Sequence, residues 1–221
     1  MLKSLYPKIS WDEVAIIGFD MDGTLYDEVD FISQVYRPIA INLTNVIDKE
    51  PNIIYSWMLS RWLEKGSSYN HIFEEVLSEV NLKKDHERII INECLEIFRE
   101  YKPKIHLSEW VEILLNEIGK SFDLFLVSDG PGKLQTRKFE SLDLGRWIMK
   151  KNIGITGNYG AEFYKPSIKI IEKIEILGDG DFEGRVVYFG DRDIDEEFSR
   201  QAGFSFVRVN CMKPLAKRDI S

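Results

Sequence analysis

Residues 14–25 read VAIIGFDMDGTL, and this stretch decides the fold. Its first half, residues 14–19, is a continuous apolar run bounded by turn residues, which is typical of a parallel strand buried on both faces. Two carboxylates, Asp20 and Asp22, follow that run directly. Because α/β sheets bind ligands at the carboxyl ends of their strands, the stretch predicts a buried strand that carries a functional site. The plainer alternative is an acidic turn in which a glycine supplies a positive φ.

Four further apolar runs and three helical patterns continue the same rhythm. The runs are 122–127, 152–156, 186–189 and 204–209, and the helical patterns are 133–142, 167–176 and 195–202. Strands that alternate with helices of about ten residues are joined by right-handed crossovers. The sequence therefore predicts an α/β fold with a Rossmann-like, doubly wound parallel sheet.

Residues 28–118 interrupt this alternation, because they contain several helical patterns and no convincing strand. The helical patterns are 31–46, 53–65, 69–80, 85–101 and 108–119, and proline, glycine and asparagine separate them. We therefore expect a helical domain over residues 28–118. It is inserted into an α/β core domain formed by residues 1–27 and 119–221.

The composition narrows the class of protein. The chain has 221 residues, of which 44% are hydrophobic, and this suffices to bury a full core. Its formal charge of −8 comes with no block of basic residues, so we expect neither a nucleic-acid partner nor a membrane surface. Cys94 and Cys211 lie far apart, and the first residues lack an apolar segment of signal-peptide length. These features predict a cytoplasmic protein without a disulfide framework.

A second polar segment follows the apolar run 122–127. It consists of Ser128, Asp129 and Gly130. A serine hydroxyl and consecutive backbone N–H groups at a strand-to-helix turn form a natural cradle for phosphate oxygens. The same sequence is also an ordinary turn, and taken alone it favours that simpler reading.

Two more segments carry charged residues near predicted strands or helices. Lys165 stands just before Pro166, which suits the first turn of a helix, although a single lysine is usually a solvated surface residue. Asp191, Asp193 and Asp195 follow the run 186–189. Carboxylates are also favoured at the start of a helix, so these acids have a structural alternative.

Taken together, the four segments in this order and spacing resemble the haloacid dehalogenase (HAD) superfamily. The resemblance covers residues 14–27 and 119–209, and the interval after Asp22 resembles the helical cap of the first type in that family. It implies that Asp20 is the nucleophile that forms an aspartyl-phosphate. It also implies that Asp22 acts as general acid and then as general base. Because the dehalogenases of the family lack a carboxylate at that second position, Asp22 favours the phosphatase branch.

The resemblance further implies a Mg²⁺ cofactor, held by Asp20, by the backbone carbonyl of Asp22 and by Asp191. An oxygen-only ligand set suits a hard octahedral cation. Asp195 matches the second acidic position of the family, either near the metal or holding Lys165. Asp193 is a weaker candidate for that position.

For the phosphate, the resemblance implies binding by Ser128, Asp129, Gly130 and Lys165, of which Lys165 also serves as a catalytic residue. We expect a phosphomonoesterase that acts on a small phosphorylated metabolite. The alternatives are a phosphomutase or other phosphotransferase of the same fold, and a non-catalytic binding protein. The sequence does not reveal the oligomeric state, the substrate, or whether Arg192 faces the substrate or the solvent.

Overall fold

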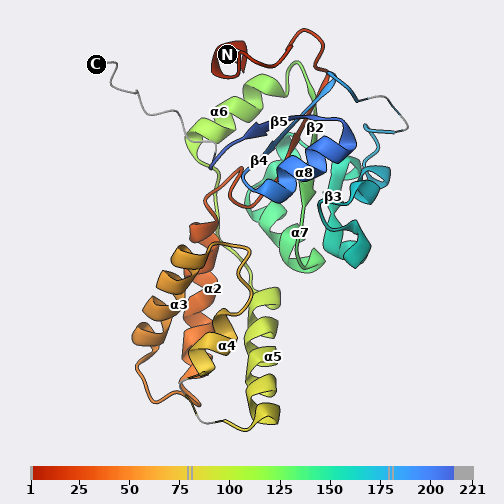
Figure 1. Cartoon of the computed structure of the whole chain (residues 1–221). Helices are drawn as coiled ribbons and strands as arrows, with labels where there is room; N and C mark the ends of the chain where they lie inside the picture. The colour runs from red at the N-terminus through yellow and green to blue at the C-terminus, as the bar shows by residue number, and fades with distance from the viewer. Residues whose placement is uncertain (1, 79, 81, 179, 181, 212–221) are drawn as a thin grey trace. The chain divides into compact units, whose positions relative to one another are not determined.

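The computed structural model describes residues 2–78, 80, 82–178, 180 and 182–211. The chain divides into two units (Figure 1). The first comprises Met1–Asp27 and Ile105–Ser221, and the second is Glu28–Lys104. We call them the α/β unit and the helical unit.

Among the described residues, five parallel strands form the sheet of the α/β unit. They are β1 (Ile16–Phe19), β2 (Asp123–Ser128), β3 (Ile153–Ile155), β4 (Val186–Gly190) and β5 (Ser205–Arg208). Their order is β3-β2-β1-β4-β5, so the chain builds outward from β1 in both directions. The five predicted strands and the doubly wound parallel sheet are confirmed.

The register of the central strands decides which residues meet. Phe19 pairs with Leu126 on β2 and with Phe189 on β4. The residues that follow these three therefore emerge at one edge of the sheet. Because the winding reverses at β1, this edge is also the switch point at which parallel α/β sheets bind ligands.

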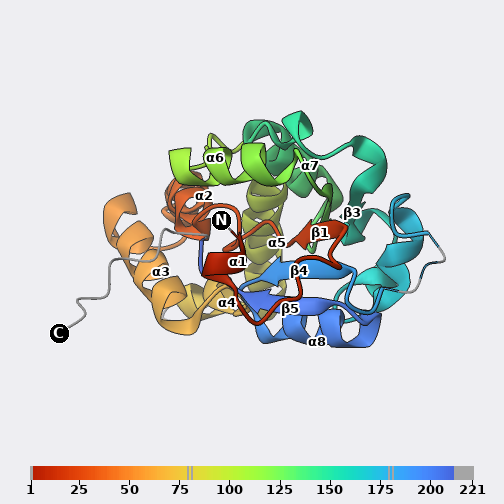
Figure 2. The ribbon, with the colours of Figure 1, turned by 90° about the horizontal axis from the view of Figure 1, so that it is seen from above.

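Helices cover both faces of the sheet (Figure 2). Helices α6 (Glu109–Ile118) and α7 (Gly132–Ser141) lie on one face, and α8 (Asp193–Ala202) lies on the other. The apolar core on the α8 face includes Phe125, Tyr188 and Phe198. Shorter elements complete the unit: α1 (Leu2–Leu5) and the 3-10 helices η1 (Leu144–Arg146), η2 (Lys150–Asn152), η3 (Thr156–Asn158), η4 (Ala161–Phe163) and η5 (Ile168–Lys173).

The segment 167–176 differs from its prediction as a regular helix, because it forms the 3-10 helix η5 instead. Ile170 and Ile174 pack against β3 so closely that a Cβ on Gly154 would lie 2.7 Å from Ile170. The apolar residues whose spacing predicted a regular helix are therefore the ones that this segment buries against β3. The close approach to β3 is made by 3-10 turns, which are common in such short connecting pieces.

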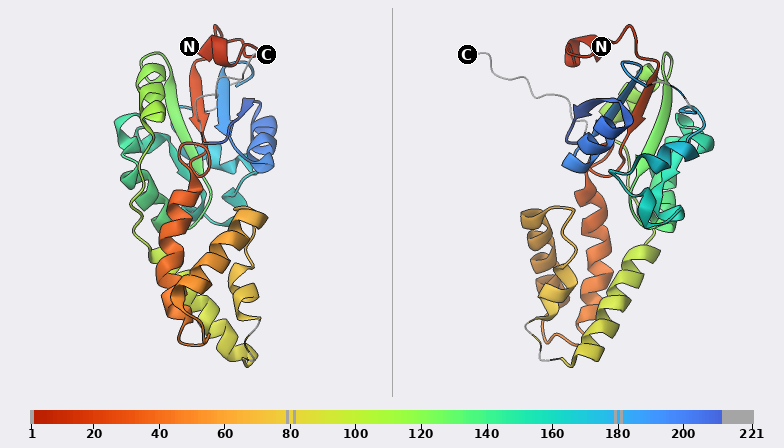
Figure 3. Two further views of the ribbon diagram at one scale, coloured as in Figure 1. Left: turned by 90° about the vertical axis from the view of Figure 1, so that its left-hand side faces the viewer. Right: turned by 45° about the vertical axis from the view of Figure 1, so that its right-hand side comes forward.

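The helical unit contains α2 (Glu28–Leu43), α3 (Pro51–Lys65), α4 (Ile72–Leu77) and α5 (Lys84–Glu100). Helix α2 packs against both α3 and α5, and Figure 3 shows these helices from two sides. Residues of α2 such as Phe31, Val35 and Ile39 are fully buried. The unit therefore has an apolar core of its own.

The helical unit ends at Lys104, whereas the predicted helical domain extends to residue 118. Helix α6 belongs to the α/β unit because its partners lie there. Trp147 donates a hydrogen bond from Nε1 to Asn116 at 2.9 Å, and Arg146 lies 3.7 Å from Glu112. A helical pattern in the sequence predicts the helix but not the unit against which it packs.

Candidate active site

Asp20 lies directly after β1 at the switch point of the sheet. Its backbone N–H donates to the carbonyl of Phe189 at 2.8 Å, which continues the β1–β4 pairing by one residue. The side chain is almost completely buried. Burial raises the pKa of Asp20 to about 7, while the charge of Lys165 opposes that rise.

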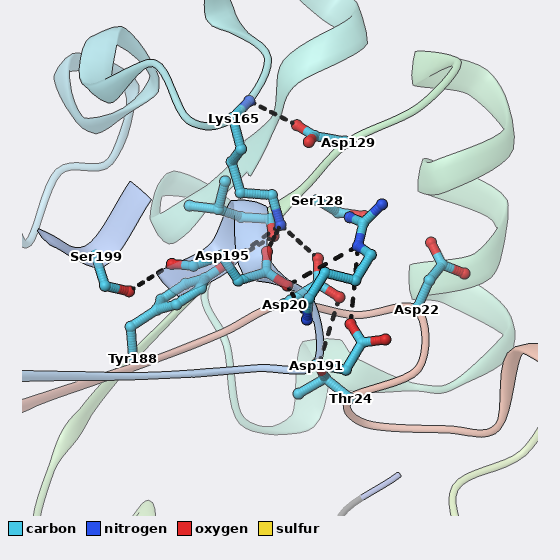
Figure 4. Close-up of polar contacts among 12 residues, drawn as sticks. Asp20, Asp22, Thr24, Ser128, Asp129, Lys165, Tyr188, Asp191, Asp195 and Ser199 are labelled. Carbon is cyan, nitrogen blue, oxygen red and sulfur yellow. Dashed lines mark hydrogen bonds and ion pairs between the residues drawn. The ribbon is translucent and has the colours of Figure 1, made fainter. Parts of the chain in front are cut away.

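Lys165 provides the counter-charge of the site (Figure 4). Its ammonium donates to Asp20 Oδ1 at 2.6 Å and to Asp195 Oδ1 at 2.5 Å, and lies 3.5 Å from the hydroxyl of Tyr188. All of these side chains are buried. Burial disfavours the charged form, but the carboxylates of Asp20 and Asp195 hold the pKa of Lys165 well above its usual value. The predicted surface alternative for Lys165 is therefore wrong.

Asp195 is fully buried at the start of α8, and both of its oxygens have partners. One accepts from Lys165, and Oδ2 accepts from the backbone N–H of Arg192 at 3.0 Å. Of the two alternatives for this residue, the contact with Lys165 is thus present. Asp193 points elsewhere, because its carboxylate is exposed and pairs with Arg208 at 2.7 Å.

Asp129 holds the backbone that carries Lys165. Its Oδ1 accepts from the backbone N–H of Lys165 at 3.2 Å and from the hydroxyl of Thr156 at 2.9 Å. The Lys165–Pro166 peptide bond is cis. The carboxylate of Asp129, a predicted phosphate-binding residue, therefore holds the neighbouring loop that carries Lys165. Any contact of Asp129 with a phosphate would come from its backbone.

Ser128 and Gly130 form the rest of this loop. Ser128 is fully buried at the end of β2, and its Oγ has no hydrogen-bond partner among the described residues. Gly130 has a φ of +133°, and a Cβ there would lie 2.5 Å from Nε2 of Gln135. Position 130 thus has no room for a side chain. The groups of this loop that could bind a ligand are therefore backbone groups and the unpaired hydroxyl of Ser128.

The carboxylates of Asp20, Asp191 and Asp195 could together hold a metal ion. One oxygen from each lies within 4.8 Å of the others. Asp191 Oδ1 is buried and has no hydrogen-bond partner among the described residues. A buried and unpaired carboxylate oxygen is costly unless something binds it, and an all-oxygen set suits Mg²⁺. The residues present therefore fit the cation that the sequence predicts.

Gly23 explains how the loop after β1 passes so close to this group. Its φ is +75°, and a Cβ would lie 2.5 Å from Asp191 Oδ2. An L-residue at position 23 would strain the backbone and collide with that carboxylate. The glycine of the first segment is therefore required by its approach to Asp191.

Asp22 lies apart from the cluster around Lys165 (Figure 4). Lys138 donates to its Oδ1 at 2.5 Å, Gln135 donates to its Oδ2 at 2.9 Å, and the hydroxyl of Tyr26 also donates to Oδ1. Burial alone would raise the pKa of Asp22, but Lys138 and these hydrogen bonds hold it below its usual value. In this arrangement Asp22 is ionised and is suited to accept a proton.

Lys138 and Gln135 were not identified from the sequence. Both are buried in α7, on the face that also carries Leu134 and Phe139. A lysine and a glutamine at helical spacing with apolar residues are a signal of buried polar partners. That signal marks the two residues as unusual, but it does not name Asp22 as their partner.

Three comparisons with known proteins bear on this site. A family model described as haloacid dehalogenase-like hydrolase matches residues 16–209. A search of curated proteins gives no match. The third comparison, with solved structures, is described below.

No helix of the described residues combines the length and apolar character needed to cross a lipid bilayer.

Solved structures with similar folds come from several organisms. One is YfnB of Bacillus subtilis, described as a HAD-hydrolase bound to magnesium, with 19% identity, a TM-score of 0.64 and coverage of 93% of this chain and 91% of that one. A protein of Thermotoga maritima described as a β-phosphoglucomutase has 20% identity, a TM-score of 0.61 and coverages of 92% and 89%. A 2-haloacid dehalogenase of Pseudomonas syringae has 18% identity, a TM-score of 0.54 and coverages of 94% and 91%. At these identities the likeness establishes the fold and leaves the reaction open.

Proposed function

Because the chain belongs to the haloacid dehalogenase-like hydrolases, we propose that it is a Mg²⁺-dependent phosphohydrolase that cleaves a small phosphomonoester through an aspartyl-phosphate on Asp20. One observation carries the proposal. The ends of β1, β2 and β4 bring Asp20, Ser128 and Asp191 together, and Ser128 Oγ and Asp191 Oδ1 are left buried without hydrogen-bond partners among the described residues. Such atoms fit a phosphoryl oxygen and a cation respectively.

The first proposed step is attack by a carboxylate oxygen of Asp20 on phosphorus. The bond between phosphorus and the ester oxygen breaks, and that oxygen keeps the electron pair and takes a proton from Asp22. Attack of a carboxylate on a phosphate dianion meets repulsion of roughly 4 kcal/mol per charge pair at 4 Å and an effective dielectric constant of 20. Lys165 counters this repulsion from the side of Asp20, and a bound Mg²⁺ ion would supply further positive charge.

The second proposed step returns Asp20 to its starting form. Water attacks phosphorus, Asp22 takes the proton of the water, and the bond between phosphorus and the Asp20 oxygen breaks. The hydrogen bonds from Lys138, Gln135 and Tyr26 favour the ionised form of Asp22, which this step needs. The first step needs Asp22 protonated, so we propose that Asp22 leaves its contact with Lys138 when substrate binds.

Two related reactions remain as alternatives with different products. A phosphomutase would use the same residues and return the phosphoryl group to the substrate, and a protein described as a β-phosphoglucomutase is among those of similar fold. Dehalogenation is disfavoured by Asp22, because a carboxylate that serves leaving-group oxygen has no role in displacing a halide. A non-catalytic role would leave the unpaired buried atoms without a use.

The test is phosphate release from a panel of sugar, nucleoside and small-acid phosphates. It compares wild type with Asp20→Asn, with Mg²⁺ and with EDTA. We expect release that needs the cation and is lost in the variant. Conversion of a sugar phosphate to its isomer without release of phosphate would instead identify the mutase. Release that persists in Asp20→Asn would overturn the proposed nucleophile.

A further inference from the structure

Arg192 stands at the turn into α8, between two of the acids of the proposed cation site. Its Nε lies 3.9 Å from Asp191 Oδ1 and 3.9 Å from Asp195 Oδ2. The charge of Asp20 also acts on the guanidinium. The carboxylates that would hold a metal ion therefore already face a fixed cation on the same chain.

The contact between the guanidinium of Arg192 and these acids is electrostatic and is not a hydrogen bond; only the backbone N–H of Arg192 is hydrogen-bonded to Asp195. A distance of 3.9 Å is well beyond the usual 2.7–2.9 Å of a charge-assisted hydrogen bond. Arg192 Nε and Asp191 Oδ1 are both buried, and neither has a hydrogen-bond partner among the described residues. The two atoms face each other across a gap, so Asp191 keeps its binding capacity while the charge of Arg192 acts on it.

Lys165 offers a direct contrast. It is hydrogen-bonded to Asp20 and Asp195, and its side chain has no exposed surface. The side chain of Arg192 is 29% exposed and is not hydrogen-bonded to either acid. Lys165 is thus built into the carboxylate group, whereas Arg192 lies beside it as a second and looser positive charge.

We propose that Arg192 sets the affinity of the Asp20, Asp191 and Asp195 group for a divalent cation, by acting as a competing positive charge. The inference rests on the proposed function for the location of the cation site. When all three carboxylates are ionised they face two cations of the chain, Lys165 and Arg192. The group then keeps one net negative charge, and removal of Arg192 doubles that charge. Arg192 lies 3.9 Å from two of the carboxylates. Allowing for solvent screening, loss of one positive charge so close to these carboxylates strengthens cation binding by about tenfold or more.

The test measures binding of Mn²⁺ to the whole chain, with electron paramagnetic resonance detecting the free ion. Mn²⁺ takes the same oxygen ligands as Mg²⁺ and serves as the probe. We expect Arg192→Gln to bind Mn²⁺ about tenfold more tightly than wild type, and Arg192→Lys to stay close to wild type because it keeps the charge. Arg200→Gln is the matched control, because Arg200 lies in α8, the helix that Arg192 precedes, and pairs with Glu197 at the surface.

Two results would overturn the inference. The first is equal or weaker binding in Arg192→Gln when its circular dichroism matches that of wild type. The second is unchanged binding in Asp191→Asn, which would place the ion elsewhere. Failure of the proposed function gives a different pattern, in which wild type and Arg192→Gln differ in Mn²⁺ affinity as expected but no phosphorylated compound is hydrolysed.

Discussion

At the level of single residues, the site depends on how buried charges are paired. Lys165 is shared between Asp20 and Asp195, and all three side chains are removed from water. Burial of ions is costly, and only their mutual contacts offset it. Removal of one partner therefore leaves the remaining groups buried without their counter-charge, and the free-energy cost of burying them is no longer offset.

We predict that Lys165→Met lowers the free energy of unfolding by roughly 3–5 kcal/mol, because two buried carboxylates lose their counter-charge. Chemical unfolding measures this loss. Lys120→Met is the control, because Lys120 pairs with Glu117 at the surface and such pairs contribute about 1 kcal/mol or less. Equal effects of the two substitutions would contradict the buried pairing.

Asp20→Asn should have a stability effect that depends on pH. Burial raises the pKa of Asp20 from 3.8 to about 7, so the folded state binds a proton that the unfolded state has lost between these values. Stability of the wild type is therefore reduced as pH rises through this range. We expect the difference in unfolding free energy between Asp20→Asn and wild type to shift in favour of the variant as pH rises from 4 to 7. Unfolding measured at each pH gives this difference. A constant difference would contradict the raised pKa.

Lys138 and Asp22 form a second buried pair, with side-chain exposures of 3% and 13%. We predict that Lys138→Met and Asp22→Asn are coupled by about 2 kcal/mol in a double-mutant cycle of unfolding free energies. The reason is that each single substitution leaves the other charged group buried without its partner, whereas the double substitution leaves no unpaired buried charge. Additive effects would show that the contact contributes little.

At the level of elements, α7 connects the loops that follow β1 and β2. Gln135 donates to Asp22 Oδ2 at 2.9 Å and to the carbonyl of Asp129 at 2.6 Å. One side chain of this helix thus ties the proposed acid–base residue to the proposed phosphate loop. The loop can approach Gln135 only because Gly130 has no side chain.

Gly130→Ala should therefore be more damaging than a positive φ alone explains. A Cβ at residue 130 would lie 2.5 Å from Gln135 Nε2, whereas Gly203 has a φ of +75° with nothing within 4 Å of its Cβ position. We expect Gly203→Ala to cost about 1 kcal/mol and Gly130→Ala to cost more and to reduce phosphate release. Unfolding and activity measured on both variants provide the comparison, and equal costs would show that Gln135 moves aside freely.

At the level of the whole molecule, the chain forms two units, and the proposed cation site belongs to one of them. Asp20, Asp191 and Asp195 are all residues of the α/β unit, whereas the helical unit has its own buried residues on α2. A ligand that binds the folded state stabilises the region that it contacts. The effect of Mg²⁺ should accordingly differ between the units.

We predict that Mg²⁺ slows amide hydrogen exchange at the ends of β1 and β4 more than in the buried α2 of the helical unit. Hydrogen exchange followed by mass spectrometry, with Mg²⁺ and with EDTA, measures the difference. In Asp191→Asn the protection by Mg²⁺ should disappear. Uniform protection across both units would argue against a cation site confined to the strand ends.

Much of the fold follows from local patterns in the sequence. The apolar runs predict all five strands, because buried parallel strands need apolar residues on both faces. The order of the strands and the polar residues at their ends place Asp20, Ser128 and Asp191 at one edge. Asp20 and Asp191 directly follow their strands and Ser128 ends β2, so the sequence places each residue at the carboxyl end of a strand. The order of the strands then makes the three residues neighbours in space.

The tertiary structure decided the features that depend on contacts between distant segments. It directs Asp193 outward and Asp195 inward, pairs Asp22 with Lys138, and turns Arg192 toward the acids. It also assigns α6 to the α/β unit. No local pattern contains this information, because the direction of a side chain and the identity of its partner are set by which elements the sheet brings together.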